Sequence, residues 1–269
     1  MTTSSDEIPT VTPVVLEYKD LVAFGQTKVD NDDDSSLRDT LIDKIGQAFG
    51  PDGLGLLGVA NVPDFSPKRE ALLRLAQKLP TLPDLDTCEL PETGYSTGWS
   101  HGREQLAPDK PDTAKGSFYA NPAVDSLVDY LIEKQADNGR DASYWHQQRK
   151  DCPAFYADNV WPASLPALRP AFRDLGQCLM HVGGLVARVC DAYCAQQGVT
   201  TAFEDTLTTS KNAKGRLLHY FDMTPIDNEK KQSESNDSAD DMWCGWHNDH
   251  VCVDRGCRGN NLLEARFLF

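Results

Sequence analysis

One succession of segments limits the fold of this chain more than any other feature. The run Arg216–Phe221 reads RLLHYF and predicts a strand, and the polar, acid-rich range 222–241 after it predicts a surface loop. Met242–His250 then carries the run WCGWHNDH. Because residues i and i+2 of a strand face the same side, His247 and Asp249 would present an imidazole and a carboxylate to one point.

An H-x-D pair of this kind suits a non-haem ferrous iron site. Two histidines and one carboxylate hold Fe(II) in a facial triad that leaves positions open for co-substrate and O₂. Trp243 and Trp246 precede the pair and can form a dry wall beside it. The tripeptide also occurs by chance, so a surface pair or a structural histidine is the alternative for His247 and Asp249.

A zinc site is a second possibility for the same run. Its four candidate ligands are spaced C-x₂-H-x₄-C-x₄-C: Cys244, His247, Cys252 and Cys257. Structural zinc sites prefer closer C-x₂₋₄-C pairs, so this irregular spacing argues against zinc.

Composition narrows the classes of partner. The chain has 269 residues, and its 41 acidic and 26 basic side chains give a formal net charge of −15. A phosphate backbone would be repelled, which argues against a nucleic-acid partner. The N-terminal run MTTSSDEIPT lacks the features of a signal peptide, and no apolar run reaches the length of a membrane span. We therefore expect a cytoplasmic protein with no membrane partner, whose eight cysteines are reduced.

The spacing of apolar residues predicts alternating strands and helices in the first third. The expected elements are a strand at Val14–Tyr18, a helix capped by Ser36 and stopped at Gly50–Gly53, a buried strand at Leu54–Val62, and a helix from Ser66-Pro67 to about Leu79.

The middle of the chain has a different character. Residues 80–122 are rich in Pro, Gly and Asp and predict a long irregular segment of the kind that is often functional. Residues 123–135 predict a helix. Ser164–Gln197 has helical spacing, with a break or kink expected at Pro170 and a stop at Gly198.

Taken in order, these segments resemble the isopenicillin N synthase-like branch of the Fe(II)- and 2-oxoglutarate-dependent oxygenases. In that family a strand of the form R-x-x-x-Y precedes a W-x-x-H-x-D segment by a loop, as RLLHYF precedes WCGWHNDH here. The resemblance implies an α+β fold, a double-stranded β-helix (jelly roll) with N-terminal helices. The corresponding ranges are a flexible tail at 1–13, an N-terminal dioxygenase-type region at 14–122, the start of the oxygenase core at 123–250 and an atypical tail at 251–269.

The resemblance also implies roles for individual residues. His247 and Asp249 would be metal ligands for Fe(II). A strand tyrosine of the family bonds 2-oxoglutarate; its best-aligned position is Phe221, so Tyr220 beside it is the candidate cofactor-binding residue. The segment that contains His101 and Arg103 resembles the stretch near the family's substrate opening, which makes these two the candidate substrate-binding residues.

Two family features have no counterpart after Asp249. The remaining residues contain neither a serine for the family's Arg-x-Ser pair nor a second ligand histidine, since His250 would point to the opposite face of a strand. The resemblance therefore predicts an oxygenase acting on a small organic molecule, incomplete at its C-terminus and inactive or impaired. The alternative is a non-catalytic binding or interaction protein that retains the front half of the fold.

Overall fold

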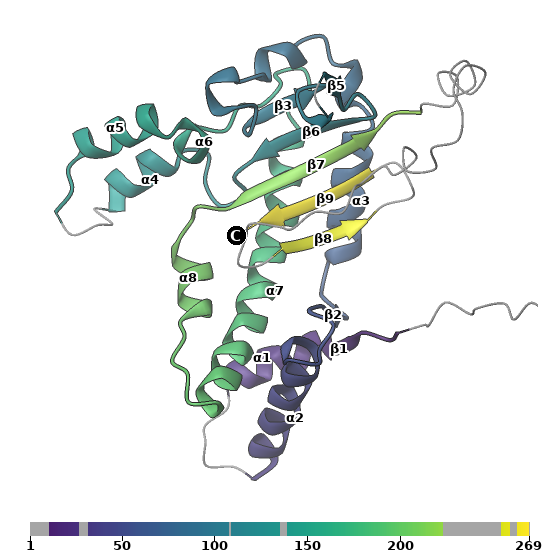
Figure 1. Cartoon of the computed structure of the whole chain (residues 1–269), viewed down its shortest axis with the longest axis vertical. Helices are drawn as coiled ribbons and strands as arrows, with labels where there is room; N and C mark the ends of the chain where they lie inside the picture. The colour runs from purple at the N-terminus through teal and green to yellow at the C-terminus, as the bar shows by residue number, and fades with distance from the viewer. Residues whose placement is uncertain are drawn as a thin grey trace, which may run out of the picture. The chain divides into compact units, whose positions relative to one another are not determined.

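The computed structural model describes residues 11–26, 32–107, 109–134, 139–222, 254–258 and 263–268. These residues form two compact units, one within Met1–Pro63 and Met180–Thr209, the other within Asp64–Leu179 and Ser210–Phe269. Both units mix helices with strands, in agreement with the expected mixed class. The long helix α7 (Leu168–Gln196) contributes residues to both (Figure 1).

The first unit is built around two short parallel strands. β1 (Val14–Glu17) pairs with β2 (Leu57–Ala60) in the register Val14↔Leu57. The helices α1 (Tyr18–Gln26) and α2 (Asp32–Phe49) lie between them in the chain. Their apolar sides meet the second half of α7 in one core that contains Leu16, Leu21, Phe24, Leu41, Ile42, Ile45, Leu185 and Val189.

Three boundaries in this unit differ from the sequence predictions. The strand predicted at Val14–Tyr18 ends at Glu17, because Tyr18 begins α1, a helix that the sequence analysis missed. The helix predicted from Ser36 already begins at Asp32. The buried strand predicted at Leu54–Val62 is limited to Leu57–Ala60, and Gly55 turns the chain at a φ of 72° just before it. The residues of this strand are only half-buried.

A carboxylate fixes the link between α7 and α8 (Phe203–Thr209) within the first unit. Asp191 accepts hydrogen bonds from the backbone N–H groups of Phe203 and Glu204, each at 2.9 Å. It thereby satisfies donors at the start of a helix that have no partner inside it. Arg188 binds Glu204 with its Nε 2.9 Å from both carboxylate oxygens, which ties the same turn to α7.

The second unit contains a five-stranded antiparallel sheet. Its strand order is β3-β6-β7-β9-β8 (Figure 1). The strands are β3 (Gly98–His101), β6 (Lys115–Ala120), β7 (Lys214–Tyr220), β8 (Asp254–Arg258) and β9 (Leu263–Leu268). A separate hairpin of β4 (Gln105–Ala107) and β5 (Lys110–Pro111) connects β3 to β6.

Helices complete the second unit. They are α3 (Phe65–Ala76), α4 (Leu127–Lys134), α5 (Ala142–Asp151) and α6 (Pro153–Tyr156), with short 3₁₀ turns at Leu79–Thr81, Leu85–Cys88 and Pro91–Thr93. α3 and the first turns of α7 lie behind the sheet in Figure 1. They share one core with it, which includes Leu72, Leu79, Trp99, Phe118, Leu168, Phe172, Leu175 and Leu217.

The prediction of a long irregular segment at 80–122 is wrong, because this segment supplies two strands of the main sheet and the β4–β5 hairpin. Its strands are short and contain glycine and serine, so their alternation covers few residues and is easily overlooked. Gly98, at a φ of 73°, opens β3 where an added Cβ would lie 1.9 Å from the carbonyl oxygen of Cys88. The glycine content that suggested a loop therefore allows close packing at the start of a strand.

The predicted helices agree more closely with the structure. The helix expected at 123–135 is α4, and Gly198, with a φ of 77°, stops the chain just after α7 as expected. Pro170 causes no break, because it lies in the first turn of α7, where a backbone N–H has no partner inside the helix. For the same reason Pro67 is accommodated as the third residue of α3, which ends at Ala76, short of the predicted Leu79.

The double-stranded β-helix stays a prediction. The described residues contain one large sheet and two pairs of strands, and a second large sheet is not among them. β8 and β9 come from the range expected to be an atypical tail, and β9 pairs with β7 from Lys214↔Leu268 to His219↔Leu263. Among the described helices, α7 is long and apolar enough to cross a membrane by length and composition, a test that core helices of other proteins also pass.

Candidate functional site

The register of the main sheet separates two chemically different faces. Residues paired across strands point to the same side, and neighbours along a strand alternate. The covered face, which packs on α3 and α7, consists of Trp99, His101, Gly116, Phe118, Leu217 and His219. The polar face on the opposite side carries Ser100, Lys115, Ser117, Tyr119, Arg216, Leu218 and Tyr220.

Two histidines meet around one aromatic ring at the end of the covered face. The ring of Phe221 lies 4.6 Å from that of His101 and 4.8 Å from that of His219, centroid to centroid. His101 Nε2 is 3.0 Å from the carbonyl oxygen of Thr113. Gly116 lies between the two histidines in the sheet register and leaves room for the Trp99 indole.

His219 is neutral in this environment near pH 7. Burial lowers its pKa, the nearby His101 lowers it further, and a hydrogen bond with the backbone of Ala76 acts in the opposite direction. Its Nδ1 is buried without a hydrogen-bond partner among the described residues. His219 is thus favoured as an uncharged imidazole, which suits packing better than charge-based chemistry.

The polar face carries a charged network that joins the sheet to the β4–β5 hairpin. Arg216 donates from Nε and Nη2 to the hydroxyl of Ser117, at 3.0 and 2.8 Å, and also binds Glu104. Lys115 Nζ lies 3.1 Å from Glu104 Oε2 and 2.9 Å from Asp112 Oδ2. The two acids come from either end of the hairpin, so the hairpin is fastened to this face by ion pairs.

Tyr119 and Lys115 keep their usual protonation states at neutral pH. Burial raises the pKa of Tyr119 to about 12, and its hydroxyl donates to Glu104 Oε1 at 3.1 Å. Burial of Lys115 lowers its pKa, but the carboxylates of Asp112 and Glu104 outweigh this effect and leave the value raised. The face therefore offers fixed charges and hydrogen bonds at neutral pH, and it suits binding of a polar ligand rather than proton transfer.

The structure separates the cofactor and substrate residues expected from the sequence. Tyr220 ends β7 on the polar face, paired with Lys115. His101 lies on the covered face, so the sheet stands between these two side chains. Arg103 lies in the loop after β3, where its Nη2 donates to Glu89 Oε2 at 2.9 Å and its guanidinium lies over the Tyr95 ring at 4.7 Å. The roles of all three residues stay predictions.

The expected metal ligands His247 and Asp249 lie outside the described residues, as do Cys244 and Cys252 of the zinc alternative. Cys257 falls on β8, whose side chains are not described. Within the described ranges, no three His, Cys, Asp or Glu side chains come together in a way that could hold a metal ion. The case for a metal therefore depends on the sequence motif.

Sequence reasoning missed the residues of the charged network. Glu104, Asp112 and Lys115 lie in the segment that was expected to be irregular, and strand pairing brings Arg216 to them across about a hundred residues of chain. The alternation of Lys115, Ser117 and Tyr119 along KGSFYA was the available signal for a strand with one polar face.

Comparison with known proteins gives similarity at the level of fold. No protein-family model matches the sequence, and no curated protein matches it. Among solved structures, the chain is similar to a protein from Caulobacter crescentus assigned to the 2OG-Fe(II) oxygenase family. The TM-score is 0.50 and the sequence identity 19%, over 78% of this chain and 57% of that one. The fold resembles that of a 2OG-Fe(II) oxygenase.

A second match is a full-length Neurospora crassa protein in complex with alpha-KG, at a TM-score of 0.45 and 14% identity, over 86% of this chain and 59% of that one. The same Neurospora protein with alpha-KG and 5-formyluracil gives a TM-score of 0.44. The chain thus spans less than two thirds of the length of the Caulobacter and full-length Neurospora proteins.

Proposed function

We propose that this chain belongs to a non-haem Fe(II)- and 2-oxoglutarate-dependent oxygenase of the isopenicillin N synthase-like type, which acts on a small organic molecule in the cytoplasm. The observation that carries the proposal is the position of the H-x-D motif. It comes after β7 in the sequence of a chain whose fold resembles a 2OG-Fe(II) oxygenase, the order that the family resemblance requires.

The ligand chemistry of the motif fits ferrous iron. His247 would provide an imidazole nitrogen and Asp249 a carboxylate oxygen, a set that suits iron better than magnesium or calcium. When bound, the iron supplies the chemistry that couples O₂ to oxidation of the substrate. A third protein ligand is not assigned.

The polar face carries two cations of the kind that bind a dicarboxylate such as 2-oxoglutarate. Lys115 and Arg216 are cations fixed by the sheet, and Tyr220 ends β7 on the same side. Both cations are paired with acids, so an incoming carboxylate must displace one of these acids. Glu104 is the better candidate, because 40% of its side chain is exposed, whereas only 4% of Asp112 is. We propose that Arg216 and Tyr220 orient the co-substrate in this way.

Metal binding is the first test, because it does not require turnover. Anaerobic titration with Co(II), a spectroscopic substitute for Fe(II), should show one site in the wild type. His247→Ala and Asp249→Ala should each weaken binding by about tenfold or more, since each removes one ligand. His146→Ala removes an exposed histidine of α5 and serves as the matched control. Equal binding by all four proteins would refute the assignment of the ligands.

Turnover distinguishes the two candidate roles. Succinate release in the presence of Fe(II), ascorbate and 2-oxoglutarate, lost in His247→Ala, would support the oxygenase. Metal binding at His247 and Asp249 without succinate release would favour the alternative, a non-catalytic binding protein on the same fold.

A further inference from the structure

Glu104, between β3 and β4, places its carboxylate among three donors on the polar face. Its Oε1 accepts from the hydroxyl of Tyr119 at 3.1 Å and from Nη2 of Arg216. Its Oε2 lies 3.1 Å from Nζ of Lys115. Lys115, Tyr119 and Arg216, here called the carboxylate cradle, thus converge on a single carboxylate group with two charges and a phenol.

The two cations of the cradle are held in place by groups other than Glu104. Arg216 donates from Nε and Nη2 to the hydroxyl of Ser117, at 3.0 and 2.8 Å. Lys115 Nζ lies 2.9 Å from Oδ2 of Asp112, whose side chain is only 4% exposed. These bonds keep the donors positioned when the Glu104 carboxylate leaves.

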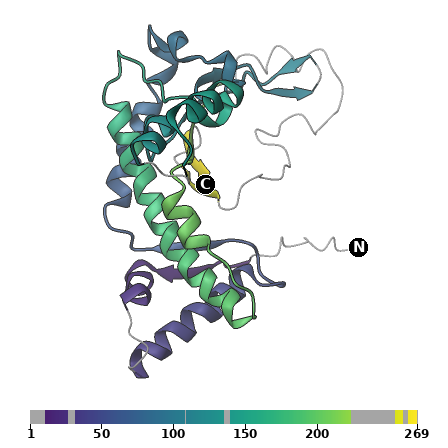
Figure 2. The same cartoon turned by 90° about the vertical axis from the view of Figure 1, so that its left-hand side faces the viewer.

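Glu104 covers the cradle on its solvent side. Its side chain is 40% exposed, against 21% for Arg216 and 15% for Lys115. Its main chain is held separately, because its carbonyl accepts from the backbone N–H of Asp112 at 2.8 Å. The β4–β5 hairpin that follows it extends outward from the rest of the second unit (Figure 2). The carboxylate can therefore leave by rotation of its own side chain, and an incoming carboxylate takes the volume that it vacates.

The charges of the network favour another anion in that position. Arg216 and Lys115 carry two positive charges, and Glu104 and Asp112 carry two negative ones. Without Glu104 one positive charge in a largely buried network is uncompensated, which is costly. Tyr119 remains a donor at neutral pH, since burial raises its pKa to about 12.

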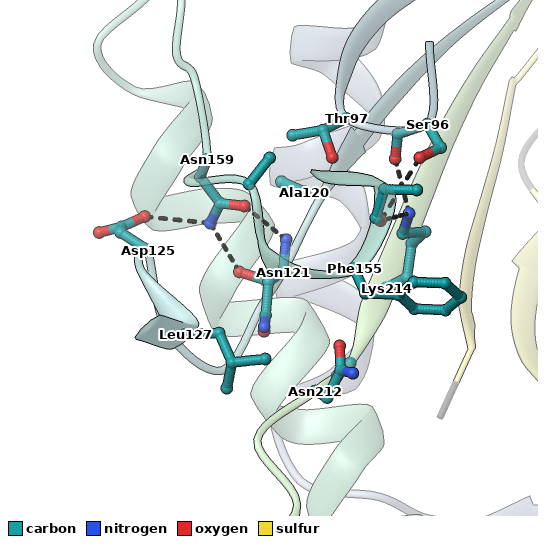
Figure 3. Close-up of a pocket in the computed structure, with 13 residues that line it drawn as sticks. Ser96, Thr97, Ala120, Asn121, Asp125, Leu127, Phe155, Asn159, Asn212 and Lys214 are labelled. Atoms are coloured by element: carbon teal, nitrogen blue, oxygen red, sulfur yellow. Dashed lines mark hydrogen bonds between the residues drawn. The ribbon is translucent and has the colours of Figure 1, made fainter. Parts of the chain in front are cut away.

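A cation at the other end of β7 shows a contrasting arrangement. Lys214 Nζ donates to the carbonyl oxygens of Ser96 at 2.8 Å and of Ala154 at 3.0 Å (Figure 3). Backbone carbonyl groups move only with the main chain, so a ligand cannot exchange with them while the fold is intact. Arg216 and Lys115 instead share a side-chain carboxylate, which a ligand of the same chemistry can replace.

We propose that Glu104 is an internal competitor for the carboxylate cradle, so that the ligand-free protein is inhibited at this face by its own side chain. Binding exchanges one carboxylate for another: Glu104 turns into solvent, and the ligand accepts from Arg216, Lys115 and Tyr119. The inference rests on the proposed function, in which a co-substrate carboxylate binds to the polar face. It adds that Glu104 sets the affinity, because the apparent dissociation constant rises as the open fraction of the site falls.

Titration calorimetry with 2-oxoglutarate tests the exchange on protein freed of metal by a chelating resin. Glu104→Gln should bind about tenfold more tightly than the wild type, the factor that two competing, partly exposed ion pairs are worth. Glu70→Gln removes the same charge from an exposed pair with Arg74 on α3 and should bind like the wild type. The double variant Glu104→Gln/Arg216→Gln should lose the gain, which locates the binding in the cradle.

Glu104→Asp provides a second variant that keeps the charge and shortens the side chain by one methylene group. Its carboxylate no longer reaches both cations, so this variant should also bind more tightly than the wild type. Affinity in both Glu104 variants equal to or below that of the wild type, or no binding by any of these proteins, would overturn the proposal. Co(II) titration of the same variants reports separately on His247 and Asp249, so a failure of the exchange is distinguishable from a failure of the proposed metal site.

Discussion

Removal of the Asp125 carboxylate should destabilise the second unit. Its Oδ1 accepts from Trp161 Nε1 at 3.0 Å and Asn159 Nδ2 at 3.2 Å. Its Oδ2 accepts from Arg169 Nε at 2.9 Å and Arg173 Nη1 at 3.4 Å. Asp125→Ala removes all of these bonds, whereas Asp125→Asn keeps an oxygen that can accept from Trp161 or Asn159.

The size of the effect follows from the exposure of each partner. The two bonds from Trp161 and Asn159 to a charged, part-buried acceptor contribute about 1.5 kcal/mol each. The two arginine pairs are partly exposed, at 53% for Arg169 and 28% for Arg173, and contribute about 0.5 kcal/mol each after screening. Asp125→Ala should therefore lower the free energy of unfolding by about 4 kcal/mol, and Asp125→Asn by about 2 kcal/mol.

Urea unfolding followed by tryptophan fluorescence measures this unit, because Trp99, Trp145 and Trp161 all belong to it. With a slope of about 2 kcal/mol per molar urea, the midpoint should fall by about 2 M for Asp125→Ala and about 1 M for Asp125→Asn. A loss below about 1 kcal/mol for the alanine variant, or equal losses for both variants, would refute this account of the network.

Two further predictions concern the covered face of the sheet. In Gly116→Ala the new Cβ would lie 2.1 Å from Cη2 of Trp99, so the free energy of unfolding should fall by about 1–3 kcal/mol. The control Gly58→Ala in β2, where the nearest side chain is 3.7 Å away, should change it little. An unchanged free energy of unfolding in urea for Gly116→Ala would contradict this packing. The pKa of His219 is lowered in the folded protein, so the unfolded chain binds more protons below about pH 6.5 and stability should fall as the pH drops through this range. His219→Gln should reduce the difference between the urea midpoints at about pH 7.5 and about pH 5.5. An unchanged difference would show that His219 does not cause the pH dependence.

Local patterns in the sequence identified the elements whose environment repeats regularly. α7 was predicted within a few residues from its apolar spacing, and β7 from the run RLLHYF, because each buries side chains at a constant interval. β3 and β6 were missed, since they are short and contain glycine and serine, residues that also predict loops. α1 was missed because it begins directly after β1, without a polar boundary.

For the candidate site too, the sequence predicts the local motif and only the fold places the distant residues. The H-x-D pair at His247 and Asp249 could be proposed from the sequence because its two candidate ligands are neighbours on one segment. The side of the sheet on which Tyr220 and His101 lie depends on the register between strands, which the sequence alone did not give.

The sequence by itself therefore determined the mixed class of the protein, its long helix and the motif that suggests iron. Only the tertiary structure decided that Arg216 meets Glu104, and that Lys214 is held by the carbonyl groups of Ser96 and Ala154, 118 and 60 residues away. Helical and strand periodicity arise from interactions over a few residues, so they are visible in the chain. Contacts between distant segments depend on how whole strands pair and which face each buries, and that is settled only when the chain folds.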